Sequence, residues 1–290
     1  MCGITGIYYF KDTLENISAK VSDSTKLLQK RGPDGNGTYI RNNVGLGHAR
    51  LAIIDTTQAA AQPFSDLADR YTIVFNGEFF NYNYHRNELM KKGIQFRSYS
   101  DTEVLLNLYK IYGSGCLEMI NGFFALAIYD ALEHTLFIAR DRSGEKPLLY
   151  SIDYDKIVFA SEMKALMAYN IAKEIDNESV LSYLQLNYIP APHSIFKQVK
   201  KLMPGEYVII KNGEVSINRY HTIIKATNQK INYEEAKEQL YALLSKAVER
   251  RLVSDVPLGA FLSGGIDSSI VVALAAENVK KLQTFSIGYK

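Results

Sequence analysis

The chain has 290 residues, of which 47% are hydrophobic and 22% are charged. These values are typical of folded globular proteins and exclude a disordered or collagen-like chain, and the length predicts two domains or one whole domain with part of another. Lysine and arginine number 33 against 31 acidic residues, without a long block of like charges. The charge pattern therefore predicts neither a nucleic-acid partner nor a membrane partner.

The start of the chain and its two cysteines predict a cytoplasmic protein. The first apolar run, residues 4–10, is interrupted by Lys11 and Asp12 too early for a signal peptide. The two cysteines are Cys2 and Cys116. In a reducing compartment we expect no disulfide bond between them, and two cysteines are too few for a metal cluster.

Hydrophobic periodicity predicts a mixed α and β domain from residue 1 to about residue 215. Short apolar or alternating runs predict strands at residues 4–10, 44–54, 71–75, 123–129, 136–139, 157–159 and 207–210. Apolar residues three and four apart predict helices at residues 17–29, 81–92, 101–113, 162–169 and 177–187. Ser100, followed by Glu103 three residues later, has the pattern of a helix N-cap.

Turn residues mark the end of this domain. Pro190 and Pro192 cannot lie inside a helix, so the preceding helix is expected to end near Asn187. Lys211-Asn212-Gly213 predicts a hairpin, and a polar, lysine-rich stretch follows it. We expect a first domain at residues 1–215, a linker at 216–232 and a second region at 233–290.

The second region has the order of a parallel α/β unit. A predicted helix at 233–253 is followed by a strand at 258–262, a glycine-rich turn, a helix at 267–277 and a strand at 284–287. Two strands separated by a helix predict a parallel sheet. Since the chain ends one strand past the turn, this region is expected to be only the beginning of a larger domain.

Cys2 directly follows Met1 and precedes Gly3. Because cysteine is a small residue, Met1 can be removed. Cys2 would then carry an α-amine with a pKa of about 8 beside a thiol with a pKa of about 8.5. A nucleophile and a proton acceptor would occupy the same residue. Without other motifs, a cysteine at this position is usually an ordinary terminal residue.

Five further motifs follow the N-terminal one. In chain order the six are Met1-Cys2-Gly3-Ile4-Thr5-Gly6-Ile7, Arg31-Gly32-Pro33-Asp34-Gly35, Gly47-His48-Ala49-Arg50-Leu51, Asn76-Gly77-Glu78, Ser100-Asp101-Thr102-Glu103, and Ala139-Arg140-Asp141-Arg142 with Gly144, Lys146, Pro147 and Leu148. Together they resemble the class II glutamine amidotransferases, and among these the asparagine synthetases. The resemblance implies an α+β N-terminal-nucleophile fold, in which two antiparallel sheets lie between helix layers, followed by an ATP-pyrophosphatase-type α/β domain.

The resemblance also implies a role for each motif residue. Cys2 would attack the glutamine side-chain amide, and Asn76 with the backbone N–H of Gly77 would form the oxyanion hole. Arg50 would bind the substrate α-carboxylate and Asp101 its α-ammonium. The set of glutamine-binding residues expected in this way is Arg50, Asn76, Glu78 and Asp101. No histidine is given a catalytic role.

Each of these residues also has a plainer interpretation. Asn76-Gly77 is a common turn pair, and residues 31–35 have ideal turn chemistry. Arg50 could be an ordinary surface arginine. Asp101 could simply cap its helix, which is compatible with substrate binding.

The glycine-rich turn of the second region predicts a pyrophosphate loop, because a strand, paired glycines and a helix N-terminus favour a bound phosphate. Its expected binding residues are Ser263, Gly264, Gly265, Asp267 and Ser268, with a further hydroxyl from Ser269. It lacks the Gly-Lys-Ser/Thr of a Walker A loop. The resemblance implies AMP-forming chemistry with ATP and Mg²⁺, the latter helped by Asp267, and no metal site built from protein ligands.

The resemblance as a whole implies a glutamine-hydrolysing, ATP-dependent ligase whose substrates are glutamine, aspartate and ATP, with a homodimer left open. Two alternatives remain. The acceptor could be another carboxylate, in surface-polysaccharide or secondary-metabolite synthesis. In the second alternative, the chain is a non-catalytic module that retains Met1. A phosphoribosyl or hexose-phosphate amidotransferase is disfavoured, because those relatives lack the 263–268 loop.

Overall fold

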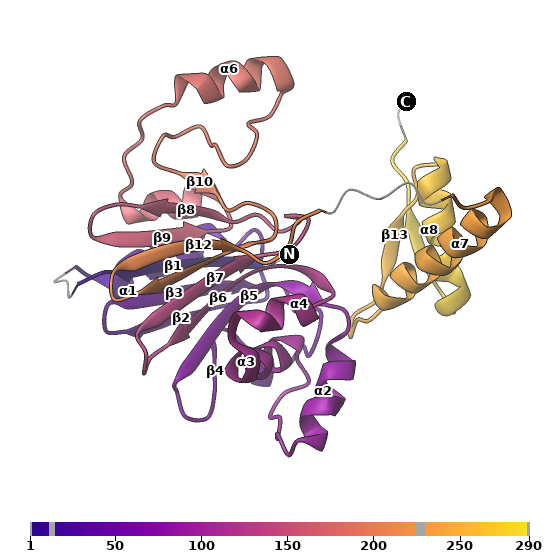
Figure 1. Cartoon of the computed structure of the whole chain (residues 1–290), viewed down its shortest axis with the longest axis horizontal. Coiled ribbons are helices and arrows are strands. Elements are labelled where there is room, and N and C mark those ends of the chain that lie inside the picture. Colours follow the sequence, from indigo (N-terminus) through magenta and orange to yellow (C-terminus); the bar gives the residue numbers. More distant parts are fainter. Residues whose placement is uncertain (1, 12–14, 224–229, 289–290) are drawn as a thin grey trace. The chain divides into compact units, whose positions relative to one another are not determined.

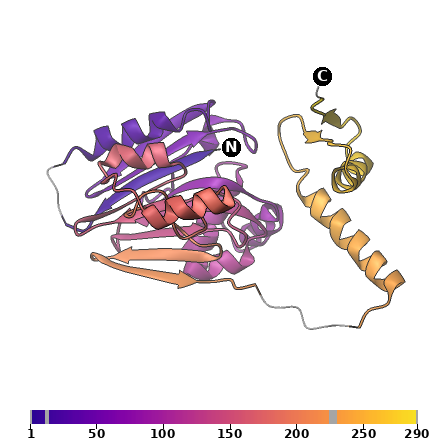
Figure 2. The same ribbon diagram turned by 90° about the horizontal axis from the view of Figure 1, so that it is seen from above.

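The computed structural model describes residues 2–11, 15–223 and 230–288, which form two compact units divided between Thr222 and Ile223. The first unit consists of two stacked six-stranded sheets with helices on their outer faces (Figures 1 and 2). This is the α+β sandwich that the resemblance implies. The expected domain end at residue 215 falls inside a strand that runs on to Arg219, because that strand pairs along its length with its hairpin partner.

The first sheet positions Cys2, which lies directly before the central strand β1. Its strand order is β10-β8-β9-β1-β3-β2, and neighbouring strands pair in antiparallel fashion. Its strands are β1 (Gly3–Tyr9), β2 (Gly35–Arg41), β3 (Val44–Arg50), β8 (Leu149–Ile152), β9 (Lys156–Ala160) and β10 (Lys200–Lys201). Strand β1 is paired on both sides, with β9 and with β3. Cys2, the residue directly before β1, is therefore attached to a firmly held strand.

The second sheet carries the Asn76-Gly77-Glu78 motif. Its order is β12-β11-β7-β6-β5-β4, again with antiparallel pairings. Its strands are β4 (Phe64–Ser65), β5 (Tyr71–Phe79), β6 (Gly122–Asp130), β7 (Thr135–Arg140), β11 (Glu206–Lys211) and β12 (Glu214–Arg219). The strand β5 was expected to end at residue 75, and the turn interpretation of Asn76-Gly77 is wrong: pairing with β6 continues from Tyr71 to Phe79.

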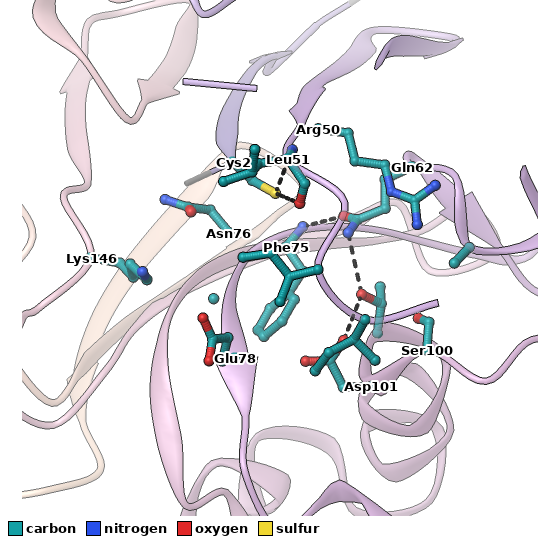
Figure 3. A pocket seen from close by; sticks show the side chains of 15 residues that line it. Cys2, Arg50, Leu51, Gln62, Phe75, Asn76, Glu78, Ser100, Asp101 and Lys146 are labelled. Atoms are coloured by element: carbon teal, nitrogen blue, oxygen red, sulfur yellow. Dashed lines mark hydrogen bonds between the residues drawn. The ribbon is translucent and has the colours of Figure 1, made fainter. Parts of the chain in front are cut away.

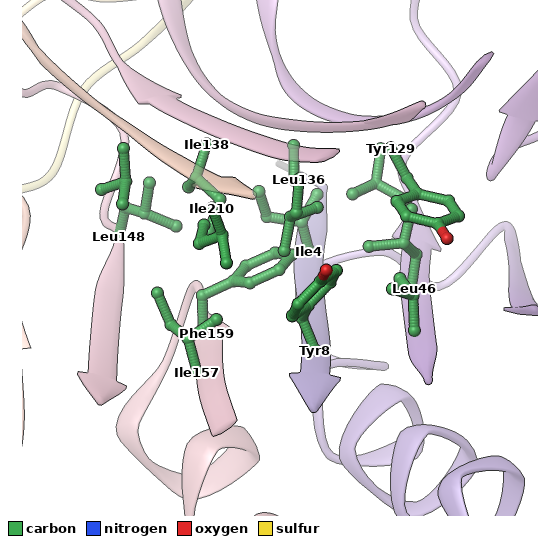
Figure 4. Packing of buried hydrophobic residues seen from close by; sticks show 14 of the residues in the cluster. Ile4, Tyr8, Leu46, Tyr129, Leu136, Ile138, Leu148, Ile157, Phe159 and Ile210 are labelled. Atoms are coloured by element: carbon green, nitrogen blue, oxygen red, sulfur yellow. The ribbon is translucent and has the colours of Figure 1, made fainter. Parts of the chain in front are cut away.

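The core of the first unit lies between the two sheets, where alternate side chains of facing strands meet. Ile4 and Phe159 from the first sheet pack with Leu136 and Ile210 from the second, and all four are buried (Figure 4). Truncating such a side chain to alanine typically costs about 2–5 kcal/mol. This packing fixes the spacing of the sheets and therefore the distance between Cys2 and β5.

Helices cover the outer face of each sheet. The elements α1 (Ile17–Leu27), α5 (Met163–Leu166) and the 3₁₀ turn η3 (Met167–Tyr169) pack on the first sheet. The helix α3 (Asp101–Tyr112) packs on β5 of the second sheet. The remaining elements of this unit are η1 (Gln58–Ala60), α2 (Tyr82–Lys91), η2 (Gly113–Gly115), α4 (Cys116–Met119) and α6 (Asn177–Leu186).

Several local predictions are confirmed. The Ser100 hydroxyl accepts the N–H of Glu103 and caps α3. Asn187, in the left-handed region, ends α6, and Asn212 with Gly213 turns between β11 and β12 at positive φ. The predicted strand at 44–54 is too long: β3 ends at Arg50. The chain then turns through Asp55, which has a φ of 48°.

The second unit contains a parallel strand pair, as predicted. Its elements are α7 (Tyr233–Arg250), β13 (Gly259–Phe261), α8 (Ile266–Asn278) and β14 (Gln283–Phe285). Strand β13 pairs with β14 in parallel, and a small cluster of Val248, Leu274 and Ala275 joins the two helices. Of the helices in the described part of the chain, none is long and apolar enough to cross a membrane.

Candidate active site

Cys2 lies directly before β1, and three contacts hold it. The N–H of Leu51 is 3.3 Å from its Sγ, and the Leu51 carbonyl lies 3.5 Å from the same sulfur. Nε of Arg31 donates to the Cys2 carbonyl at 2.8 Å, while Arg31 also pairs with Glu162 at 3.3 Å. The 31–35 motif therefore has a structural role: it anchors the backbone of the proposed nucleophile.

The pKa of the Cys2 thiol is raised by burial, and the Leu51 N–H opposes this by favouring the thiolate. The thiol is therefore mostly protonated at neutral pH, and reaction requires a base that removes its proton. Cys116 is buried at the start of α4, and burial raises its pKa to about 12. Cys2 lines the pocket that also holds Asn76, and Cys116 does not.

Asn76 lies in the middle of β5 with its side chain beside Cys2 (Figure 3). Only 1% of its surface is exposed, yet neither its Nδ2 nor its Oδ1 has a hydrogen-bond partner among the described residues. Buried amides without partners are rare because losing their hydrogen bonds to water costs free energy. An Asn76 amide that opens into a pocket is therefore poised to bind a ligand.

Gly77 is required by close packing of β5 on β6. A Cβ atom at this position would lie 2.4 Å from the carbonyl oxygen of Phe123 and 2.8 Å from the Cβ of Phe124. Even alanine could not be added without moving one of the strands. The glycine thus keeps the backbone next to Asn76 in place.

The direction of the Gly77 N–H follows from the ladder. The backbone of Phe124, its partner on β6, bonds instead to Asp141, so the Gly77 N–H points away from β6. Its neighbours on that edge are the N–H groups of Phe75 and Phe79. Gln62 Oε1 accepts the first at 2.6 Å and Asp101 Oδ2 accepts the second at 3.1 Å. The Gly77 N–H lies between these two bonds, on the pocket side.

Asp101 is buried at the first position of α3. Burial raises the pKa of its carboxyl group to about 6, the nearby negative charge of Glu78 adds to the rise, and hydrogen bonds from the Phe79 and Thr102 N–H groups and the Thr102 hydroxyl oppose it. A cation placed beside this carboxylate would relieve the cost of its burial. The site therefore favours a positively charged group such as an ammonium.

Arg50 ends β3 and points into the same pocket. Its Nη1 donates to the Thr57 carbonyl at 2.8 Å and its Nη2 to the Asp55 carbonyl. The Asp55 carboxylate in turn accepts the N–H of Tyr99 at 2.7 Å, which ties this loop to the segment before α3. The guanidinium has five N–H donors, so these two bonds orient it and leave capacity for a carboxylate.

Lys146 is a pocket residue that belongs to a sequence motif but had no predicted role. Its ammonium lies 4.1 Å from the centre of the Phe123 ring, and burial lowers its pKa while the charge of Glu78 raises it. Glu78 lies on β5 two residues after Asn76 and lines the same pocket. The pocket thus contains charges of both signs, as recognition of a zwitterion requires.

The expected glutaminase residues thus line one pocket, whereas His48 does not. The lining residues are Cys2, Arg50, Leu51, Ile53, Ile54, Ala60, Gln62, Phe75, Asn76, Gly77, Glu78, Ser100, Asp101, Thr102 and Lys146. His48 is fully buried beneath β5, where its Nε2 is 3.2 Å from the Phe75 carbonyl. Burial lowers its pKa to about 3, so it stays neutral.

Gln62 and Thr102 are also pocket residues that sequence reasoning missed as functional. The signal for Thr102 was its place inside the Ser-Asp-Thr-Glu motif. Gln62 had no signal of its own, because its bond to the Phe75 N–H forms only when the loop before β4 folds against β5.

In the second unit, the residues expected to bind pyrophosphate lie in the turn between β13 and α8, which holds Ser263, Gly264 and Gly265, and in the first turn of α8. Gly264 has a φ of +82°, a conformation that favours glycine, and Gly265 caps the 13-residue helix. The hydroxyls of Ser263 and Ser268 are 3.0 Å apart, and Asp267 lies in the first turn of α8. Among the described residues no group of three histidine, cysteine, aspartate or glutamate side chains could hold a metal ion.

Comparisons with known proteins match the two units of the structure to two different families. Residues 1–221 match the glutamine amidotransferase domain family, and residues 239–290 match the asparagine synthase family. Two glutamine-hydrolysing asparagine synthetases of Bacillus subtilis, numbered 1 and 3, are 37% and 36% identical over the whole chain. An amidase of Penicillium rubens is 33% identical over 90% of the chain and 39% of its own length.

The chain spans 46% and 48% of the two Bacillus synthetases, about half of their length. Among solved structures, the glutamine phosphoribosylpyrophosphate amidotransferase of B. subtilis matches with a TM-score of 0.58 at 19% identity, over 98% of this chain and 65% of that one. At this identity the likeness shows the fold alone. The chain belongs to the glutamine amidotransferase domain family.

Proposed function

We propose that the first unit hydrolyses glutamine to glutamate and ammonia, with Cys2 as the nucleophile. The observation that carries this proposal is the buried amide of Asn76, which has no hydrogen-bond partner among the described residues and lies in the pocket that Cys2 lines. A buried hydrogen-bond donor without a partner, next to a thiol, is the arrangement that stabilises an oxyanion formed when sulfur attacks a carbonyl. The Gly77 N–H, directed into the same space by the ladder, is the second donor.

The charged residues of the pocket support glutamine as the substrate. The Arg50 guanidinium, oriented by two backbone carbonyls, would bind the α-carboxylate. The Asp101 carboxylate would bind the α-ammonium, with Glu78 contributing negative charge nearby. Between these anchors, the side-chain amide of glutamine would reach toward Cys2 and Asn76.

The proposed reaction has two halves. The thiol proton passes to the α-amine of Cys2, the thiolate attacks the amide carbon, and the negative oxygen is held by Asn76 Nδ2 and the Gly77 N–H. The C–N bond then breaks, and the amine returns its proton to the leaving nitrogen, so that ammonia departs and a thioester remains. Water attacks the thioester with the same amine as base, which releases glutamate and restores the thiol.

This route requires a free α-amine on Cys2, and therefore removal of Met1. An α-amine ordinarily has a pKa of about 8, which is close enough to neutrality for it to accept the thiol proton. No other base is needed: His48 is buried and neutral, and its Nε2 contacts a backbone carbonyl.

For the second unit we propose that the 263–268 loop binds the phosphates of ATP. The residues fit such a ligand, because Gly264 and Gly265 leave the loop backbone open to an anion and α8 directs its N-terminus toward it. The hydroxyls of Ser263 and Ser268 would donate, and Asp267 would help to hold Mg²⁺. When bound, ATP with Mg²⁺ would activate a carboxylate as its adenylate.

We further propose that aspartate is the acceptor, so that the full reaction makes asparagine. The two synthetases that match the whole chain support this. Another carboxylate is the alternative acceptor, since one relative of similar identity carries the name amidase and not asparagine synthetase. The domain bounds, cytoplasmic location and homodimer remain predictions.

The glutaminase proposal is tested by ammonia release from glutamine by the parent chain and by a Cys2→Ala variant. We expect glutamate and ammonia in equal amounts from the parent and none above background from the variant. Mass spectrometry of the N-terminus should show Met1 removed from active protein. Equal activity of the two proteins, or activity in chains that all retain Met1, would refute the mechanism. Adding aspartate and ATP to a chain of full family length tests the acceptor.

A further inference from the structure

We infer that Gln62 is a positioning residue that acts through Thr102 to keep Asp101 in the state that binds the substrate ammonium. The inference rests on the proposed function and deepens it. Three hydrogen-bonded side chains connect two N–H groups on one edge of β5: Gln62, Thr102 and Asp101 (Figure 3). The motifs that resemble the family do not include Gln62.

The first bond fixes the orientation of the Gln62 amide. The Phe75 N–H can only donate, so the atom that it meets at 2.6 Å must be Oε1. Nε2 therefore faces Thr102 and donates to its Oγ1 at 3.2 Å. The orientation of this amide is set by the strand, not by solvent.

The second bond fixes the direction of the Thr102 hydroxyl. Since its oxygen accepts from Gln62, its own hydrogen is free to point to Asp101 Oδ1, which is 3.4 Å away. The other carboxylate oxygen, Oδ2, accepts the Phe79 N–H. Donors thus reach both oxygens of Asp101, and a carboxyl that receives donors on both oxygens favours its ionised form.

This support matters because Asp101 is buried, which raises the pKa of its carboxyl group to about 6. Other titratable and charged groups line the same pocket: the negative charge of Glu78 on β5 disfavours ionisation of Asp101, a Cys2 thiolate would do the same, and Arg50 and Lys146 carry positive charge. Removing the donor chain would raise the Asp101 pKa further toward the working pH. The substrate ammonium would then meet a neutral carboxyl.

Gln62 has a second effect on the same edge. It occupies the Phe75 N–H, while Asp101 occupies the Phe79 N–H, so that the N–H of Gly77 between them faces the pocket as the open donor. Without Gln62, the Phe75 N–H would face the pocket as well. The carbonyl oxygen of a substrate could then bind two residues away from its productive position.

The test compares the pH dependence of kcat/KM for glutamine in the parent, in Gln62→Met and in the pair Thr102→Val and Thr102→Ser. The acid limb has one break from the Cys2 amine and a lower one from Asp101, and we expect Gln62→Met and Thr102→Val to move the Asp101 break upward by about one pH unit. KM should then rise about fivefold near pH 6 and about tenfold at lower pH. At high pH the KM should approach that of the parent. Thr102→Ser keeps the hydroxyl and should keep the parent profile.

A matched control is Gln58→Met, because Gln58 is an exposed glutamine on η1 outside the pocket. The Gln62→Met and Thr102→Val double variant should be no worse than either single one, since both cut the same chain. The rate of Cys2 alkylation by iodoacetamide should be unchanged. If Gln62→Met does not fold, the Thr102 pair carries the test.

The two proposals fail in different ways. If the parent and Gln58→Met release no ammonia, glutamine hydrolysis itself is refuted. If the parent is active but Gln62→Met and Thr102→Val lower kcat/KM equally at every pH, the acid limb is unmoved. Gln62 then has only a structural role, and the inference is overturned.

Discussion

Replacing Asp101 with asparagine should stabilise the protein at neutral pH while it removes glutamine binding. The carboxyl pKa is about 6 in the folded chain against an ordinary value of 3.8, mainly because of burial. Two pKa units correspond to about 3 kcal/mol of free energy that the ionised carboxylate costs the folded state. Asparagine retains an oxygen for the Phe79 N–H and carries no charge.

The size of this effect depends on pH. Because folding raises the Asp101 pKa, the parent is relatively most stable when Asp101 is protonated, below about pH 4, and loses that stability as the pH rises through about 6. The free energy of unfolding, measured with denaturant between pH 4 and 7.5, should therefore differ little between parent and variant at pH 4. Above pH 6 the variant should be more stable by about 3 kcal/mol.

Asp130→Asn is the opposite control. Burial opposes ionisation of Asp130, but its bonds with Arg70 prevail and lower its pKa. That variant should lose stability at neutral pH, and the loss should fade as the pH falls through the folded pKa. If Asp101→Asn is no more stable than the parent at pH 7, the carboxylate is not strained by burial, and the electrostatic basis of ammonium binding fails.

Three other predictions concern the pocket. Asn76→Ala should lower kcat for glutamine hydrolysis about 10²–10³-fold with a smaller change in KM, because it removes an oxyanion donor. Gly77→Ala should lower both activity and the unfolding midpoint in urea, since its Cβ would lie 2.4 Å from the Phe123 carbonyl oxygen. Limiting iodoacetamide followed by peptide mapping should label Cys2 and spare Cys116, whose pKa is raised to about 12 by burial; equal labelling would contradict this.

Local chemistry made parts of the fold predictable. Ser100 could be identified as a cap because its side chain satisfies a backbone group three residues away. The end of α6 at Asn187 could be predicted because Pro190 and Pro192, a few residues later, cannot lie inside a helix. The Asn212-Gly213 hairpin follows from the same kind of local preference. Strands with apolar faces, such as β6 and β7, were found from their periodicity because both lie in the core.

Features that depend on distant partners were not predictable. Asn76-Gly77 has turn chemistry, yet nine-residue pairing of β5 with β6 keeps it in a strand. Strand β2 was missed because none of its residues is fully buried, half-buried and exposed positions alternating along it, and because it begins in a glycine-rich stretch. The six motifs gave the pocket its main residues, but the place of Gln62 beside β5 depends on folding of the loop before β4.

The most direct test of the proposed chemistry is to trap the covalent intermediate. Parent protein would be mixed with glutamine, quenched in acid within the first turnover, and digested for mass spectrometry. We expect a glutamyl thioester on the N-terminal peptide that begins with Cys2, present with glutamine and absent from Cys2→Ala. Ammonia release without an adduct on this peptide, or an adduct on Cys116 instead, would contradict the assignment of Cys2 as the nucleophile.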